Sequence, residues 1–343
     1  MLKDYNLPMP DNMSKEDIIN LLLKEEYGYL PPKPLEVTAH IESTTENFAA
    51  GKGEHRVIKL TCVTENGDFT FPVYYSYPTG VEGDVPCFIQ INFRDMVPDI
   101  YQPTEEIIDS GFAVLSFCYK DVSSDDGDFS NGLAGIVYPD GVQSEDGCGK
   151  IGLWAWAAMR VMDYALTLPG IDHKCISVCG HSRLGKTALL AGALDERFFC
   201  AFSNNSGNSG AALSRKNTGE TVNVITDVFP YWFCKSYANY GEKEDTLPFD
   251  QHYLIAANVP HKVYVASAAK DLWACPPNEY RSCIAASSYY ESHGMKGFVH
   301  PDREAEIGDF FSEGDIGYHL RGGTHYLSRE DWQYYIKYIN LHR

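Results

Sequence analysis

The segment Cys-Ile-Ser-Val-Cys-Gly-His-Ser-Arg-Leu-Gly-Lys-Thr, residues 175–187, decides how the rest of this 343-residue chain is interpreted. Its apolar beginning predicts a strand that ends at Cys179, and the Ala/Leu-rich residues 186–194 predict a helix. Glycines on both sides of Ser182 allow a tight turn between the two. The Ser182 hydroxyl is therefore expected to stand exposed at the end of a strand and at a helix N-terminus.

The same residues fit a second motif. Gly180, Gly185, Lys186 and Thr187 match the phosphate-binding pattern G-x-x-x-x-G-K-[ST]. In that interpretation backbone N–H groups and Lys186 bind phosphates, and Thr187 holds magnesium. In the other, Ser182 is a nucleophile. The motif alone leaves both open, together with a turn that carries no chemistry.

Composition bounds the class of protein. A chain of 343 residues with 44% hydrophobic residues can bury a large core, and α/β proteins of this length are often one domain. We expect a helical extension over residues 1–36 and one catalytic domain over residues 37–343. The net charge of -19 disfavours nucleic acid and anionic membrane surfaces as partners, because it repels both. A neutral substrate, or one whose acid is masked, fits better.

Targeting and metal signals are weak. No stretch has the ~20 apolar residues of a spanning helix, and the first residues lack the apolar core of a signal peptide. This predicts a cytoplasmic protein, or a secreted one if a leader has been removed. The ten cysteines are irregularly spaced and lie mostly in apolar runs, which predicts buried free thiols. Cys175 and Cys179 share a strand face without a second Cys/His pair, so we expect neither a metal nor a cofactor.

The pattern along the chain predicts an α/β fold with a mostly parallel sheet, helices on both faces and an N-terminal antiparallel hairpin. The expected helices are 14–27, 104–110, 151–168, 186–194, 277–293 and 328–341, and the expected strands are 56–64, 69–77, 87–93, 112–118, 175–179, 200–203 and 262–266. Residues 120–149 are polar and rich in Gly and Asp, which predicts a solvated surface loop.

Chain order separates the two chemistries. An α/β hydrolase places its acid after a later strand and its histidine near the C-terminus. Asp271 follows the expected strand 262–266, and His325 lies between two glycines and a capped helix at 328–341. A nucleotide-binding loop has no use for this histidine. The order favours Ser182 as nucleophile, His325 as base and Asp271 as the acid that orients the imidazole.

Further stretches carry a more specific pattern. They are residues 180–189, 195–198, 206–215, 219–221, 229–233, 250–252, 266–273, 325 and 331–332. Together they resemble the glucuronoyl esterases of carbohydrate esterase family fifteen, especially the bacterial members, from about residue 37 to the C-terminus.

The resemblance implies an α/β-hydrolase fold and a serine esterase that acts on hemicellulose such as xylan. The implied substrate is a 4-O-methyl-glucuronoyl ester, either a small molecule or an oligosaccharide. It assigns the oxyanion to Arg183 and the sugar to Lys186, Glu220 and Trp273. On spacing alone, these three would be a solvated helix charge, a surface acid and a core aromatic. Many members place the acid at the position of Asn205, which cannot offset the imidazolium charge.

Other activities stay open at this point. One is an acetyl-xylan-type deacetylase; more remote ones are a non-catalytic carbohydrate-binding relative and a nucleotide binder. The sequence does not define the oligomeric state.

Overall fold

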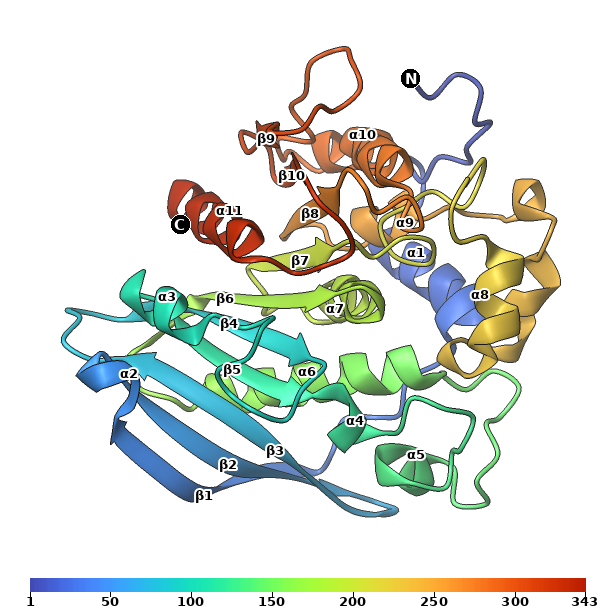
Figure 1. Cartoon of the computed structure of the whole chain (residues 1–343). Helices are drawn as coiled ribbons and strands as arrows, with labels where there is room; N and C mark the ends of the chain where they lie inside the picture. The colour runs from blue at the N-terminus through green and yellow to red at the C-terminus, as the bar shows by residue number, and fades with distance from the viewer.

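A ten-stranded sheet runs through the computed structural model, which describes residues 1–343 (Figure 1). The strand order is β1-β2-β3-β5-β4-β6-β7-β8-β10-β9. The strands are β1 Glu36–Asn47, β2 Gly53–Thr64, β3 Gly67–Pro78, β4 Val85–Asn92, β5 Ala113–Cys118, β6 Ile171–His181, β7 Cys200–Asn204, β8 Lys262–Ala268, β9 Phe310–Phe311 and β10 Ile316–Arg321. Strands β5, β4, β6, β7, β8 and β10 are parallel to one another. Strands β1, β2, β3 and β9 are antiparallel to their neighbours. The expected parallel sheet and hairpin are confirmed.

Helices cover both faces of this sheet. They are α1 Lys15–Leu22, α2 Phe48–Gly51, α3 Thr104–Asp109, α4 Tyr119–Val122, α5 Gly132–Val137, α6 Lys150–Ala165, α7 Arg183–Leu194, α8 Val222–Val228, α9 His252–Ala256, α10 Pro276–Ser292 and α11 Arg329–His342. Short 3-10 turns lie at Pro230–Trp232, Lys235–Tyr240 and Glu244–Thr246, and a π-helical turn at Leu23–Tyr27. Residues of α3 and α11 share one buried cluster, and residues of α6, α7 and α10 share the other.

Successive residues of the central strands point to opposite faces, as the pleat requires. Phe88 of β4 belongs to the cluster under α11, where its ring lies 5.1 Å from that of Trp332. Ile89, the next residue, belongs to the cluster under α6 and α7. The continuous apolar run of β4 therefore reflects burial on both sides.

The N-terminal segment packs into this core. Ser14 and Asp17 form a capping box that starts α1, and Ile18 is fully buried. At the end of the following turn Tyr27 is also fully buried, and its hydroxyl donates to the Ser209 carbonyl at 2.8 Å. The first 36 residues thus support the loop after β7, while the boundary at residue 36 stays a prediction.

Residues 120–149 differ from the solvated loop expected from their composition. They contain α4 and α5, and Phe129 and Leu133 are buried in the main core. The carboxylate of Asp125 is 8% exposed and pairs with Arg183. The prediction was wrong because a few apolar anchors among many polar residues suffice to fold a segment onto the protein.

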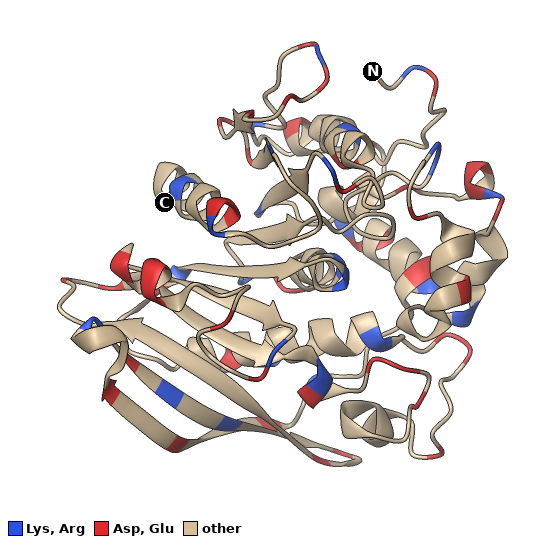
Figure 2. Cartoon of the chain, viewed as in Figure 1, with Lys and Arg blue, Asp and Glu red and all other residues tan.

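Charge is kept away from the centre of the sheet. Figure 2 shows almost none on the inner strands, and most of it on the outer strands, helices and loops. All ten cysteines are buried and free, as predicted. None of the helices combines the length and the apolar character that crossing a bilayer requires.

Candidate active site

Ser182 lies in a strained turn between β6 and α7. Its φ of 59° and ψ of -128° belong to a region that non-glycine residues rarely adopt. The turn also needs Gly180, since a Cβ there would lie 2.0 Å from the Leu184 carbonyl oxygen. The Ser182 N–H donates to the Asn204 carbonyl at 2.8 Å, which ties the turn to the end of β7. This is the sharp strand-to-helix turn predicted from the sequence.

His325 and Asp271 meet, although 54 residues separate them. Nδ1 of His325 lies 2.6 Å from Oδ2 of Asp271, so the imidazole N–H donates to the carboxylate. Asp271 is buried, whereas the His325 side chain is 41% exposed. The His325 ring centroid lies 4.4 Å from that of His181, the residue before Ser182. The pair therefore stands beside the turn.

No hydrogen bond joins Ser182 to His325 in this structure. Such bonds often form only when substrate is bound. The neighbouring His181 remains neutral, because burial and the charge of His325 lower its pKa to about 3. Its Nδ1 hydrogen-bonds Asn204 Oδ1 at 2.7 Å. His181 thus acts as a neutral support for the His325 ring.

Asn205, the other residue considered for the acid from the sequence, directly follows β7. Its backbone N–H donates to the Ala266 carbonyl at 2.7 Å, and its Nδ2 reaches the Tyr326 carbonyl at 3.4 Å. It makes no hydrogen bond to the imidazole of His325. Asp271, at the end of β8, is the group that does.

The three residues assigned to sugar binding lie together. Lys186 Nζ donates to Glu220 Oε2 at 2.9 Å, and Trp273 Nε1 donates to Glu220 Oε1 at 3.3 Å. Lys186 and Glu220 are buried, while Trp273 is 53% exposed. The predictions from spacing alone, a solvated Lys186, a surface Glu220 and a core Trp273, are therefore wrong. The cluster presents an aromatic face backed by an ion pair.

The contacts of Lys186 and Thr187 contradict the phosphate-binding interpretation. Besides Glu220, the Lys186 ammonium donates to the carbonyls of Ser206, at 2.7 Å, and Asn208. Its three N–H groups are thus used within the protein. Thr187 Oγ1 donates to the Arg183 carbonyl at 2.9 Å. No group of three or more His, Cys, Asp or Glu side chains is arranged to hold a metal ion.

Two buried residues that sequence reasoning missed hold the His325 loop. Arg321 Nε donates to Asp331 at 2.8 Å, and the Arg321 guanidinium also donates to the carbonyls of Gly322, Thr324 and Tyr326. Burial raises the pKa of Asp331, but its hydrogen bond with His319 and the Arg321 charge bring it below the ordinary value. From the sequence, Asp331 was placed in the cap of the last helix and in the family pattern at residues 331–332, but was given no contact with the His325 loop. The only sequence feature that could have indicated this support is the position of Arg321 at the end of the buried strand β10.

A third missed residue, Glu279, supports the loop after β7. It is fully buried and accepts from Ser267 Oγ at 2.5 Å and from the Gly207 N–H at 3.0 Å. Burial raises its pKa to about 7. This loop supplies the carbonyls that receive Lys186.

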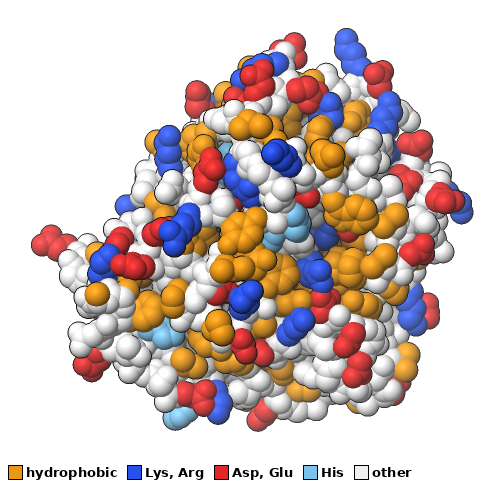
Figure 3. Space-filling view, viewed as in Figure 1, with side chains coloured by type: hydrophobic (Ala, Val, Ile, Leu, Met, Phe, Trp, Pro, Cys, Tyr) orange, Lys and Arg blue, Asp and Glu red, His pale blue; other side chains and the backbone are white.

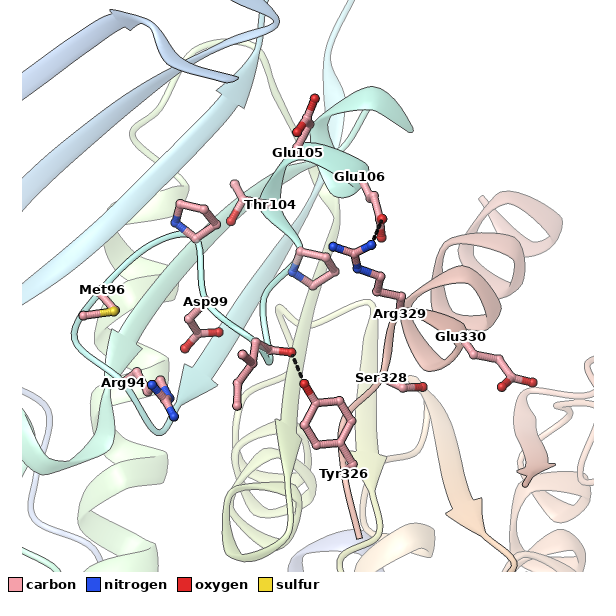
Figure 4. A pocket seen from close by; sticks show the side chains of 13 residues that line it. Arg94, Met96, Asp99, Thr104, Glu105, Glu106, Tyr326, Ser328, Arg329 and Glu330 are labelled. Atoms are coloured by element: carbon pink, nitrogen blue, oxygen red, sulfur yellow. Dashed lines mark hydrogen bonds and ion pairs between the residues drawn. The ribbon is translucent and has the colours of Figure 1, made fainter. Parts of the chain in front are cut away.

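A groove of about 840 Å³ begins beside the histidine loop (Figure 4). Residues 94–104 form one wall, and Tyr326 with the first turn of α11 forms the other. The Tyr326 hydroxyl donates to the Ile100 carbonyl at 2.8 Å, and Arg329 pairs with Glu106 at 3.1 Å. In Figure 3, hydrophobic side chains gather around a histidine near the middle of the same face.

Three features define an α/β hydrolase: a serine at a strand-to-helix turn after β6, an acid after the later parallel strand β8, and a histidine after the last strand, β10. A family model described as "Glucuronyl esterase, fungi" matches residues 60–294. The chain belongs to the glucuronyl esterase family.

Individual relatives agree with this assignment. A carbohydrate esterase (MZ0003) from an unknown prokaryotic organism is 41% identical over 69% of this chain and 55% of its own length. A 4-O-methyl-glucuronoyl methylesterase from Podospora anserina is 30% identical over 82% of this chain and 56% of its own. The chain thus spans about half the length of these curated relatives.

Among solved structures, a promiscuous CE15 esterase from a marine bacterial metagenome has a TM-score of 0.88 and 30% identity. The alignment covers 99% of this chain and 98% of that one. The α/β-hydrolase fold is confirmed along the whole chain.

Proposed function

We propose that this chain hydrolyses carboxylic esters of carbohydrates, with a 4-O-methyl-glucuronoyl ester as its substrate. The observation that carries the proposal is the His325–Asp271 hydrogen bond beside the strained Ser182 turn. Family membership and the names of the relatives support the ester and the sugar.

The reaction proceeds through an acyl-enzyme. Ser182 Oγ forms a bond to the ester carbonyl carbon while its proton passes to His325 Nε2. The alcohol leaves with that proton when the C–O bond breaks. Water then gives a proton to His325 and attacks the acyl carbon, and Ser182 recovers its proton as the acid departs. Asp271 keeps Nδ1 protonated and stabilises the imidazolium that forms twice in this cycle.

Arg183 stabilises the oxyanion. Its backbone N–H belongs to the residue after the nucleophile, which is the usual donor in this fold. Its guanidinium adds positive charge within one residue of the developing negative charge.

Lys186, Glu220 and Trp273 hold the sugar. Glu220 accepts from a sugar hydroxyl and Lys186 fixes the orientation of Glu220, while the exposed Trp273 ring lies against the apolar face of the sugar. The alcohol lies on the other side, in the groove at Tyr326, because His325 must protonate the leaving oxygen on its own side.

The test compares two substrates with the purified chain. We expect a benzyl ester of 4-O-methyl-glucuronic acid to be cleaved faster than an acetylated xylo-oligosaccharide, and Ser182→Ala to cleave neither. Faster release of acetate would replace the proposal with a deacetylase. A chain that turns over neither ester and resists a fluorophosphonate probe would be a non-catalytic carbohydrate-binding relative, since only an activated serine reacts with the probe.

A cytoplasmic location is a separate proposal, which cell fractionation tests.

A further inference from the structure

Asp125 is an aspartate whose side chain is only 8% exposed; it accepts from three side-chain donors and has no part in the reaction described so far. It accepts from Arg183 Nη1, from Trp232 Nε1 at 2.8 Å and from the Tyr119 hydroxyl at 2.9 Å. Its backbone carbonyl accepts from the Tyr231 hydroxyl at 3.0 Å. The donors come from α4, the start of α7 and the Pro230–Trp232 turn, so Asp125 joins three segments at one point.

Arg183 is held on several sides at this point. Its guanidinium carbon lies 4.6 Å from the Trp232 ring centroid, 5.3 Å from that of Phe229 and 5.9 Å from that of Phe93. Aromatic faces attract a guanidinium but let it rotate in its own plane. The ion pair with Asp125 fixes that rotation, because it engages Nη1 alone.

The remaining donors of Arg183 are free. Its Nε is buried and has no hydrogen-bond partner in the protein. A buried N–H group of a charged side chain gains from a hydrogen-bond acceptor. A ligand oxygen that arrives during the reaction supplies one.

We propose that Asp125 is a positioning residue for ester hydrolysis: it orients the guanidinium of Arg183 so that the free N–H groups receive the oxyanion. The inference rests on the role given to Arg183 above.

Two effects of Asp125 oppose each other. Its negative charge weakens the field of Arg183 at the oxyanion, while its hydrogen bond keeps the donors in place. Donors act only within about 2.7–3.1 Å of the oxyanion, and the loss of one costs roughly 10²–10³-fold in kcat. Positioning therefore outweighs the partial neutralisation.

The first experiment measures kcat and KM of Asp125→Asn with p-nitrophenyl acetate, a general ester that reports an activated serine without a sugar. The amide cannot accept from both Arg183 and Trp232, so we expect kcat to fall about 10- to 100-fold with little change in KM, as for an interaction made in the transition state. Asp126→Asn, at an exposed neighbouring acid, is the matched control and should behave as wild type.

A double-mutant cycle separates positioning from general damage. In an Arg183→Ala background, Asp125→Asn should cause no further loss of kcat, because the residue through which Asp125 acts is gone. An equal loss in both backgrounds, or a rise in kcat of the single variant, would overturn the inference. If Asp125→Asn does not fold, Asp125→Glu keeps the charge, displaces it by one methylene, and should show a smaller loss that also vanishes without Arg183.

Two substrates and the fluorophosphonate probe distinguish a wrong role for Asp125 from a wrong substrate. Wild-type cleavage of p-nitrophenyl acetate without cleavage of the glucuronate ester would reject the substrate and leave the role of Asp125 testable. An unreactive wild type that also resists the fluorophosphonate probe would reject both.

Discussion

Two side chains at the ends of neighbouring strands, Asn205 and Asp271, are candidates to orient the imidazole of His325. Only Asp271 bonds to it, at 2.6 Å, and only a carboxylate offsets its charge. Asn205 instead reaches the next peptide, at Tyr326. The acid of this chain is therefore best assigned to the end of β8.

Removing each side chain tests this assignment. Asp271→Ala should lower kcat by on the order of 10³–10⁴-fold, since the imidazole loses its orientation and its counter-charge. Asn205→Ala should retain most activity. The φ of Asn205 is 45°, which asparagine adopts more readily than alanine, so Asn205→Ala can lower stability through the backbone alone. Thermal denaturation of both variants, measured alongside the esterase assay, separates this effect from a loss of activity. The reverse pattern of activities would mean that the acid is wrongly assigned.

Trp273 offers a substitution that leaves the fold untouched. It is 53% exposed, so Trp273→Ala should change the melting temperature little, but it removes the surface on which we propose that the sugar lies. We expect KM for the glucuronate ester to rise several-fold and the kinetics with p-nitrophenyl acetate to stay constant. Leu272→Ala, at a neighbour that is 74% exposed, serves as control. Equal KM values for Trp273→Ala and wild type would remove Trp273 from the sugar site.

At the scale of elements, the loop between β10 and α11 depends on one side chain. Arg321→Lys keeps the charge but cannot donate simultaneously to Asp331 and to the carbonyls on both sides of His325. We expect kcat to fall about 10- to 100-fold through misplacement of the imidazole, with the protein still folded. Lys296→Arg, at an exposed ion pair with Glu313 outside the groove, should have no effect. A folded Arg321→Lys variant with normal kcat would show that the loop holds its shape without this support.

The turn at Ser182 makes a second prediction at this scale. Gly180→Ala places a methyl group 2.0 Å from the Leu184 carbonyl, which only a backbone shift relieves. We expect insoluble protein or a large drop in melting temperature, together with loss of activity. Gly185→Ala meets its nearest atom, Ser206 Cβ, at 3.0 Å and should be milder. Circular dichroism melts of both variants compare them; equal melting temperatures would contradict the steric argument.

Over the whole molecule, buried acids couple stability to pH. Burial raises the pKa of Glu26 from 4.5 to about 8, even though hydrogen bonds from Ser209 and Gln251 lower it. Between these values the folded protein keeps a proton that the unfolded chain releases, so stability falls as pH rises from about 5 to about 8. Glu279, with a pKa of about 7, acts in the same direction over the lower part of this window.

Melting temperatures between pH 5 and 8 test this coupling. Glu26→Gln keeps an oxygen that accepts from Gln251 Nε2 but cannot ionise, so its melting temperature should depend less on pH. The difference should be greatest from about pH 5.5 to about pH 7, where folded Glu26 holds almost one proton more than the unfolded chain. Glu25→Gln is the control, since the pKa of Glu25 is lowered and it is ionised across this range. An unchanged slope for Glu26→Gln would show that Glu26 does not titrate with folding.

Most of the regular elements followed from local pattern. The helices at residues 151–168 and 328–341 and the hairpin from 56 to 77 agree with α6, α11 and β2–β3 within a few residues. Strand β1 was missed because its apolar alternation is short, with Val37, Ala39 and Ile41 only, and because the residues after Ile41 are polar and exposed. The segment 120–149 was misjudged because composition averages over the few residues that anchor it.

The sequence by itself determined the parallel sheet, the serine at its turn, the order of serine, acid and histidine, and the burial of the thiols. These depend on hydrophobic periodicity, on small residues at a turn and on the position of residues along the chain. The sequence also favoured Asp271 over Asn205 as the acid. Only the tertiary structure showed that Asp271 hydrogen-bonds His325, that Lys186 is buried against Glu220, and that Asp125 contacts Arg183 and Arg321 contacts the His325 loop. Those contacts join segments far apart in the chain, and a side chain's partner is set by where the folded backbone brings it.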